Sequence, residues 1–396
     1  MFNSNPFNFY SPVNIIYGKG ALNRLKDLKL PGIKAVIVTA GDGSMDAYAA
    51  RVKSLLAEQN IDAAVFAEIG TNPDTNLVDR AAAFAAAQGC DFIVALGGGS
   101  SIDCSKGMAV VVKNGGKCWD YVVSGSGGRK PITNGALPII AVPTTAGTGS
   151  EVSYVAVISN EATNEKQVIF SPLLFSKIAI IDPELTYTVP KHLTAFQGFD
   201  AFTHALEGLL IKKNSAVTDM YALEAIRLIG EYLPRAVENG RDEEARCALA
   251  AASNLAGIVL AQAGSSSEHP LEHALSAYFP RLPHGAGLAT VFEAYYEEVI
   301  AQDTVNDKLT RAAKAMGLPV DGVSDKDGAL CFLHAVVDMM KQIGLYQLDL
   351  TRFDVVDPDI DAMAELVSQS GTIVNADCWR LDKESLTRIL TKSLSR

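Results

Sequence analysis

The sequence predicts two domains: an α/β domain built on a parallel sheet, followed by an all-α domain. Up to about residue 185, short β-branched runs alternate with helical patterns. Beyond about residue 193 the pattern is helical, with few such runs. The chain has 396 residues, 48% of them hydrophobic, and single cores stop growing at roughly 250–300 residues. We therefore expect one domain over residues 1–185 and another over residues 186–396.

The elements of the first half follow from hydrophobic runs and the residues that end them. Residues 35–39 (AVIVT) are typical of a buried strand, residues 91–96 run straight into three glycines, and residues 137–142 end at Pro143. The other expected strands are 63–66, 155–159, 167–171 and 177–182, and the expected helices are 46–59 and the Ala-rich 76–88. Strands separated by helices predict a parallel sheet covered on both faces.

The second half is expected to be helical throughout. Its clearest helical patterns are residues 195–210, 216–238, 241–263, 303–315 and 329–343. No internal repeat or low-complexity segment interrupts them. These helices would form a second core.

Composition excludes several classes of function. The net charge of −11 makes nucleic acid an unexpected partner, because an acidic surface repels phosphate backbones. No leader-like segment or run of about 18 apolar residues is present, so no membrane span is expected. Six cysteines without a CxxC pair indicate reduced thiols. The sequence therefore predicts a cytoplasmic protein.

A glycine-rich loop follows the strand at residues 91–96. The sequence GGGSSIDCSK reads as a tight turn and the start of a helix, and we expect Ser100 or Ser101 to cap that helix. Glycines allow close backbone approach, and a helix N-terminus offers free N–H groups. This combination suits a pyrophosphate.

A second loop, PTTAGTGSE, follows the strand at residues 137–142. Parallel strands place both loops at the carboxyl edge of the sheet, where ligands of open α/β sheets bind. The threonines can donate to a ribose or a carboxamide. Together the loops predict a dinucleotide site.

A cluster of ionisable residues lies in the second half. Asp200 and His204 are four apart in a helical context, His269 and His273 repeat that spacing, and His284 follows. Residues four apart share one helical face. A carboxylate with imidazoles suits Fe²⁺, Zn²⁺, Mn²⁺ or Co²⁺ and does not suit Ca²⁺. The cluster therefore predicts a transition-metal site.

These loops and this cluster together resemble the iron-containing (group III) alcohol dehydrogenase family. The resemblance covers nearly the whole chain, through GGGSSIDCSK, PTTAGTGSEVS, DPELTYTVP, GFDAFTHALEG and LPHGAG in that order. It implies an N-terminal Rossmann-like parallel-sheet domain and a C-terminal all-helical domain, the plan of dehydroquinate synthase-like proteins.

The resemblance also assigns site residues. It implies metal ligands at Asp200, His204, His269 and His284, with Fe²⁺ favoured over Zn²⁺, and catalytic roles for His273, near the nicotinamide, and Asp103. The cofactor-binding residues that it implies are Gly97, Gly98, Gly99, Ser100, Asp103, Lys106, Thr144, Thr145 and Thr148.

Two departures from the family pattern bear on these assignments. Many members read HxxxHPLG, whereas here Pro270 follows the first histidine. Aligning His269 to the second family histidine would put Ser265 at the ligand position and would need an insertion of about five residues before His284. The favoured alignment, with His269 as the ligand, needs an insertion of only about one residue and keeps the HxxxH spacing. The second departure is Ala40, at a position where NAD-dependent members carry an acid. Asp42 is two residues further on, so the cofactor is NAD or NADP, with NADP(H) slightly favoured.

The expected function is metal-dependent hydride transfer between NAD(P)(H) and an alcohol, aldehyde or ketone. Glycerol dehydrogenase-like or dehydroquinate synthase-like chemistry on the same fold is an alternative, as is a non-catalytic metal- or nucleotide-binding protein. Expected partners are a small alcohol or aldehyde and, at family level, a second copy of the chain in a homodimer.

Overall fold

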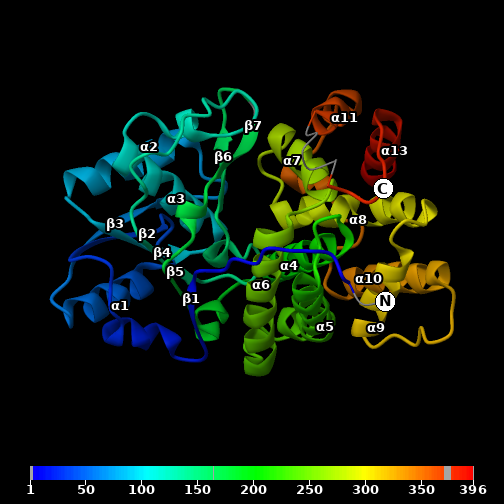
Figure 1. The fold of residues 1–396 in the computed structure, drawn as a ribbon, viewed down its shortest axis with the longest axis horizontal. Helices are drawn as coiled ribbons and strands as arrows, with labels where there is room; N and C mark the ends of the chain where they lie inside the picture. Colours follow the sequence, from blue (N-terminus) through cyan, green and yellow to red (C-terminus); the bar gives the residue numbers. More distant parts are fainter. Residues whose placement is uncertain (1–2, 164, 370–375, 396) are drawn as a thin grey trace. The chain divides into compact units, whose positions relative to one another are not determined.

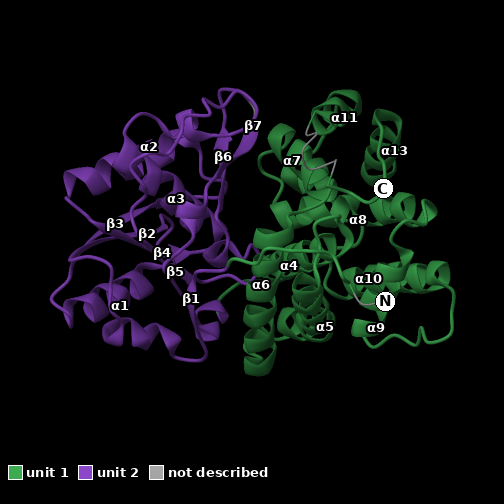
Figure 2. Ribbon diagram, in the orientation of Figure 1, with its two compact units in different colours: residues 1–10, 188–396 green, residues 11–187 purple. Residues whose placement is uncertain are grey.

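The structure, a computed structural model, describes residues 3–163, 165–369 and 376–395. It divides into two compact units, coloured separately in Figure 2. The α/β unit is Ser11–Tyr187, and the helical unit is Thr188–Arg396 together with Met1–Tyr10. The division expected from the sequence lies near residue 185 and assigns residues 1–10 to the α/β half. In the structure these residues group with the helical unit, where the backbone of Tyr10 exchanges two hydrogen bonds with the Gln262 amide, at 3.0 and 2.8 Å.

Six parallel strands form the sheet of the α/β unit, in the order β1-β8-β5-β4-β2-β3 (Figure 1). Their bounds are β1 Asn14–Tyr17, β2 Lys34–Ala40, β3 Asp62–Ile69, β4 Phe92–Gly97, β5 Ile139–Pro143 and β8 Ile178–Ile181. The predicted parallel sheet is thus confirmed. β4 and β5 are neighbours with Gly97 opposite Pro143, so the loops after them begin side by side.

Helices cover both faces of this sheet, as its hydrophobic strands require. α1 (Asp46–Ala57) packs on one face, against the side chains of Ala35 and Ile37. α2 (Thr75–Ala87) and α3 (Gly99–Asn114) pack on the other, against Val36 and Val38. Alternate residues of one strand therefore enter two separate cores, which fixes the register of the strand.

Two predicted strands lie outside this sheet. β6 (Val155–Asn160) and β7 (Glu165–Phe170) form their own antiparallel pair. Their connection is too short for the crossover that a parallel pair needs. Conversely, the edge strand β1 was not predicted, because its sequence NIIY has only a short hydrophobic run and its residues are largely exposed.

The helical unit contains only helices and loops among its described residues. The helices are α4 Lys191–Leu210, α5 Ala216–Glu238, α6 Glu243–Ala263, α7 Glu268–Tyr278, α8 His284–Ala301, α9 Asn306–Ala315, α10 Asp325–Gln342, α11 Ile360–Ser368 and α13 Lys383–Leu394. Ser215 caps α5 and Asp242 caps α6, each through a side-chain oxygen that accepts a backbone N–H. The all-helical prediction for this half is confirmed.

The core of the helical unit surrounds α4. Phe199 and Phe202 on this helix are fully buried against Phe292 of α8, and Phe202 also stacks on Phe332 of α10. α4 is buried around nearly its whole circumference, so the polar residues that it carries need partners inside the protein.

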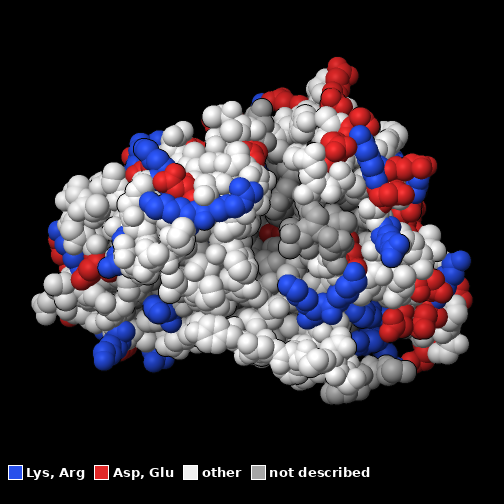
Figure 3. Space-filling view, turned by 45° about the horizontal axis from the view of Figure 1, so that its top comes forward, with Lys and Arg blue, Asp and Glu red and all other residues white. Residues whose placement is uncertain are grey.

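Among the described residues, one helix is long and apolar enough to span a membrane by length and composition. This is α6, but 67% of its most apolar window is buried within the protein, as in the core helix of a globular unit. Both basic and acidic side chains lie on the face shown in Figure 3.

Candidate active site

The glycine loop between β4 and α3 is packed against the loop that follows β5. A Cβ atom on Gly98 would lie 3.0 Å from Thr145 Cγ2, and one on Gly99 would lie 2.6 Å from Thr148 Cγ2. Thr144 N–H also donates to the Gly97 carbonyl at 3.0 Å. The structure thus brings together the predicted residues Gly97, Gly98 and Gly99 with the three threonines, and the glycines make that approach sterically possible.

The start of α3 differs from the expected serine cap. The helix begins at Gly99, Gly98 is the N-cap, and no side chain caps it. Ser100 and Ser101 already lie inside the first turn, so the predicted capping role was wrong. The first backbone N–H groups consequently have no side-chain acceptor, an arrangement suited to an anion.

Asp103 and Lys106, both on α3, bind residues at the end of the second loop and at the start of β6. Ser150 Oγ donates to Asp103 Oδ1 at 2.5 Å, and Val157 N–H donates to Oδ2 at 3.0 Å. Lys106 Nζ donates to Ser150 Oγ at 2.8 Å, Ser153 Oγ at 3.0 Å and the Val155 carbonyl at 2.7 Å.

Both side chains of this pair are shielded from solvent. That of Lys106 is 0% exposed and that of Asp103 is 13% exposed. Burial lowers the pKa of Lys106 to about 8 and raises that of Asp103, an increase that the neighbouring ammonium opposes. These contacts join α3 to the threonine loop.

The acidic residue near the end of β2 is already engaged. Asp42 Oδ1 accepts hydrogen bonds from Ser44 N–H at 3.0 Å and Ser44 Oγ at 2.5 Å, and these bonds lower the pKa of Asp42. Ala40, the position at which the family pattern expects an acid, offers no charge.

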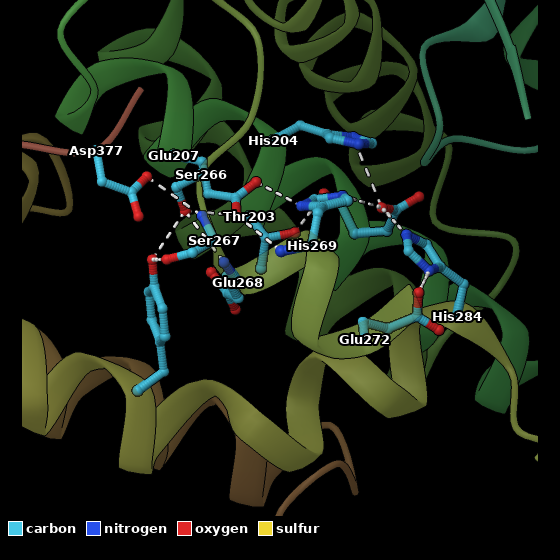
Figure 4. Close-up of polar contacts among 12 residues, drawn as sticks. Thr203, His204, Glu207, Ser266, Ser267, Glu268, His269, Glu272, His284 and Asp377 are labelled. Atoms are coloured by element: carbon cyan, nitrogen blue, oxygen red, sulfur yellow. Dashed lines mark hydrogen bonds and ion pairs between the residues drawn. The ribbon is translucent and has the colours of Figure 1, made fainter. Parts of the chain in front are cut away.

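In the helical unit, three helices bring the predicted ligands together. Asp200 and His204 lie one turn apart on α4, His269 is in the first turn of α7, and His284 is the first residue of α8. Asp200 Oδ1 lies 3.6 Å from His204 Nδ1, 3.8 Å from His269 Nε2 and 3.4 Å from His284 Nε2. Figure 4 shows the three imidazoles converging on one place.

Within this group, Asp200, His269 and His284 each offer an atom within 4.8 Å of the others. His204 lies at the edge of the group, with its ring stacked on that of His269 at 4.6 Å between centroids. Because His269 rather than a displaced serine faces Asp200, the geometry supports the alignment that takes His269 as the ligand. Pro270 is the third residue of α7, where its missing N–H still leaves no helical bond unmade.

The cluster contains buried polar atoms that the protein leaves unsatisfied. Asp200 Oδ1, His204 Nδ1 and His269 Nε2 have no hydrogen-bond partner among the described residues. Burying such atoms unpaired costs about 1–3 kcal/mol each. One carboxylate oxygen and several imidazole nitrogens pointing at one place form a donor set that fits a divalent transition metal.

The charges of Asp200 and His204 suit a cation. Burial opposes ionisation of Asp200, but His204 and His284 hold its pKa well below the usual value. Burial lowers the pKa of His204 to about 4, so this imidazole is neutral near pH 7. An ionised carboxylate and a neutral imidazole are the forms that bind metals. Burial opposes ionisation of His269, but Glu207 and Asp200 outweigh it and hold the pKa of His269 well above its usual value, so His269 must lose a proton to bind a metal.

His273, the predicted proton-transfer residue, lies beside this cluster. Its ring centroid is 5.7 Å from that of His284 and 6.2 Å from that of His269. Together with Glu272 and His284 it forms a second group of potential ligand atoms within 4.8 Å of one another. The side chain is half-buried rather than buried.

Sequence reasoning missed two carboxylates at this site. Glu207 contacts His269 Nδ1 and Glu272 contacts His284 Nδ1, and both glutamates are fully buried. The available signal was spacing, since Glu207 follows His204 by three residues and Glu272 follows His269 by three.

Comparison with known proteins gives two consecutive family matches. Residues 12–183 match the sequence model of "Iron-containing alcohol dehydrogenase", and residues 194–394 match that of "Fe-containing alcohol dehydrogenase family, C-terminal". The matches together span nearly the whole chain and cover each unit separately.

Individual relatives agree with these matches. The chain is 36% identical to a Citrobacter freundii 1,3-propanediol dehydrogenase, over 92% of this chain and 91% of that protein. It is also 36% identical to "Alcohol dehydrogenase 4" of Schizosaccharomyces pombe, over 70% of this chain and 65% of that protein. Among solved structures, an archaeal halo-thermophilic alcohol dehydrogenase from a Red Sea brine pool, bound to NZQ, superimposes with a TM-score of 0.92, at 32% identity and with full coverage of both chains.

Proposed function

The chain belongs to the iron-containing alcohol dehydrogenase family, and from this premise we propose that it uses a metal ion at Asp200, His204, His269 and His284 to interconvert an alcohol and an aldehyde or ketone with a nicotinamide cofactor. The observation that carries the proposal is the buried Asp200 Oδ1, which has no hydrogen-bond partner and faces three imidazoles.

Family membership implies NAD(H) and an iron-type metal, and we propose Fe²⁺ before Zn²⁺. When bound, the ion supplies Lewis-acid polarisation of the substrate oxygen. Asp200 contributes negative charge, and the imidazoles contribute neutral nitrogen donors. Burial of Asp200, His204 and His269 limits access of water to this part of the site.

The chain holds the cofactor through backbone and hydroxyl groups of the α/β unit. Gly97, Gly98, Gly99 and Ser100 present the uncapped start of α3 to the pyrophosphate, as its free N–H groups allow. Thr144, Thr145 and Thr148 offer hydroxyl groups on the adjoining loop. Direct cofactor contact and catalysis by Asp103, and cofactor contact by Lys106, stay predictions, because the contacts described above favour an indirect role in holding that loop.

We further propose a preference for NADP(H) over NAD(H). Ala40 presents no carboxylate to repel a 2′-phosphate, and Asp42 is turned toward Ser44. The ratio of kcat/KM for NADPH to that for NADH measures the preference. Ala40→Asp should lower this ratio by at least about tenfold, since it adds a charge that pairs with a 2′-hydroxyl and repels a phosphate. An unchanged ratio would contradict the assignment.

His273 is the proposed proton-transfer residue, because it is half-buried and its ring centroid lies 5.7 Å from that of the ligand His284. The proposed location is the cytoplasm, which agrees with six free cysteines. The proposed partners are a small alcohol or aldehyde and a second copy of the chain, the latter pairing through the exposed edge strand β1.

The experiment combines metal reconstitution with a substrate screen. Metal-free protein is loaded with Fe²⁺ or Zn²⁺ and assayed with alcohols and aldehydes by nicotinamide absorbance. Steady turnover that requires the ion is expected. Full activity without metal would refute the Lewis-acid role, and absence of net nicotinamide oxidation or reduction with every substrate would refute dehydrogenase activity.

A further inference from the structure

Two of the ligand histidines are contacted by buried carboxylates on the side away from Asp200. His269 turns Nε2 toward Asp200 and Nδ1 toward Glu207. His284 likewise turns Nε2 toward Asp200 and Nδ1 toward Glu272. Both glutamate side chains are fully buried, and Figure 4 shows each of them beside its histidine. Each imidazole therefore has a carboxylate at Nδ1, on the side opposite the Nε2 atom that faces Asp200.

Each carboxylate is in turn held by a serine. Ser266 Oγ donates to Glu207 Oε1 at 2.7 Å, and Ser276 Oγ donates to Glu272 Oε1. In both cases the second carboxylate oxygen contacts the histidine. Glu272 Oε2 forms a hydrogen bond with His284 Nδ1, whereas Glu207 Oε2 and His269 Nδ1 form an ion pair without hydrogen-bond geometry. The site thus contains two Ser–Glu–His arms, Ser266–Glu207–His269 and Ser276–Glu272–His284.

Glu207 also fixes the backbone of its histidine. Its Oε1 accepts the His269 N–H at 3.2 Å, and no side-chain oxygen of the N-cap residue Ser267 caps α7. Glu207 therefore serves as a cap for the first turn of α7 as well as a partner for the ring.

An imidazole has two tautomers, and the hydrogen bond at one nitrogen decides which nitrogen carries the lone pair. A carboxylate at Nδ1 requires the proton there and leaves Nε2 free to bind a cation. It also restricts ring rotation, so less ordering remains to be done when the ion binds.

We propose that Glu207 and Glu272, each held by its serine, are positioning residues that orient His269 and His284 for the metal. The inference rests on the proposed metal site. The two arms are not equivalent, because Glu207 faces a backbone N–H as well as a hydroxyl, whereas Ser276 can reverse its hydroxyl and accept a hydrogen bond. An amide at position 272 can therefore replace the carboxylate, but an amide at position 207 would point a donor at a donor.

The test measures Co²⁺ binding to metal-free full-length protein, using the visible absorption of the ion to report both affinity and coordination geometry. Glu207→Gln should weaken Co²⁺ binding by about 10–100-fold. Glu272→Ala should have a similar effect, while Glu272→Gln should restore most of the affinity. Ser276→Ala should weaken Co²⁺ binding by about fivefold, as expected from the loss of one hydrogen bond. Because this substitution is small, it still tests the inference if a glutamate variant fails to fold.

Glu268→Gln is the matched control. Glu268 is as deeply buried as Glu207, and its Oε2 accepts a hydrogen bond from Tyr296, which an amide oxygen can also accept. This variant should bind Co²⁺ within about twofold of the wild type, because position 268 holds no ligand ring.

The outcomes separate this inference from the proposed function. Wild-type protein that binds no Co²⁺ would overturn the metal site and the inference with it. Wild-type binding together with unchanged affinity and spectrum in Glu207→Gln, Glu272→Ala and Ser276→Ala would overturn only the positioning role. Equal loss in Glu272→Gln and Glu272→Ala would also contradict it, since charge rather than orientation would then matter.

Discussion

Replacing Gly99 with alanine tests whether close approach of the two loops creates the cofactor site. The added Cβ would lie 2.6 Å from Thr148 Cγ2, 2.9 Å from Thr148 Oγ1 and 3.1 Å from Thr148 Cβ. Distances below 3.0 Å require the Thr148 side chain or its loop to shift, and overpacking of this kind costs about 1–3 kcal/mol. A cost of this size in the cofactor-bound conformation of the two loops should raise the cofactor Kd roughly 5- to 150-fold.

The assay is fluorescence titration of NADH and NADPH into the purified protein. Gly70→Ala is the control, because a Cβ at Gly70 meets nothing within 4 Å and Gly70 needs no positive φ. Thr148→Ser in the Gly99→Ala background should recover part of the affinity, since it removes the nearest methyl group and keeps the hydroxyl. Wild-type affinity in Gly99→Ala, or an equal loss in Gly70→Ala, would refute the reasoning.

Three further predictions concern the buried charges. Lys106→Met should lower the free energy of unfolding by about 3–5 kcal/mol in denaturant titrations, because it leaves Asp103 buried without its cation; the exposed Lys113→Met on the same helix should change it little, and equal effects would contradict the role of the pair. Burial raises the pKa of Asp377 to about 7, so the folded state binds more protons than the unfolded state between about pH 4 and 7. The free energy of unfolding should therefore fall as pH rises through this range to 7. Asp377→Asn should flatten this fall, and an unchanged pH profile would argue against it. His204→Ala should lower bound metal, measured by elemental analysis, and reduce kcat/KM at least about 100-fold, and retention of both would count against its role as a ligand.

Much of the fold was predictable because the relevant signals are local. Strands such as β4 and β5 are continuous hydrophobic runs that end in glycine or proline, which is typical of strands buried on both faces. β1 gives a weaker signal, because its hydrophobic run is short, most of its residues are exposed, and its pairing with β8 depends on a distant partner. The separate antiparallel pairing of β6 with β7 was not predicted, although the short connection between them is a local signal for it.

The ligand cluster was predictable because histidines are rare in this chain and two pairs have helical spacing. Glu207 and Glu272 were harder to predict, since their helical spacing from a histidine is a weak signal that does not distinguish a buried glutamate from a surface glutamate. Periodicity usually identifies the buried face of a helix, but α4 is buried on nearly all sides and gives no contrast. The capping role expected for Ser100 or Ser101 was wrong because the helix starts earlier, at Gly99.

The most direct measurement is a crystal structure of the protein loaded with Zn²⁺ or Fe²⁺, with anomalous data collected at the absorption edge of the metal. We predict one peak per chain within about 2.0–2.2 Å of Asp200, His204, His269 and His284. A peak among Glu272, His273 and His284 instead, or no peak near Asp200 in fully loaded protein, would contradict the account.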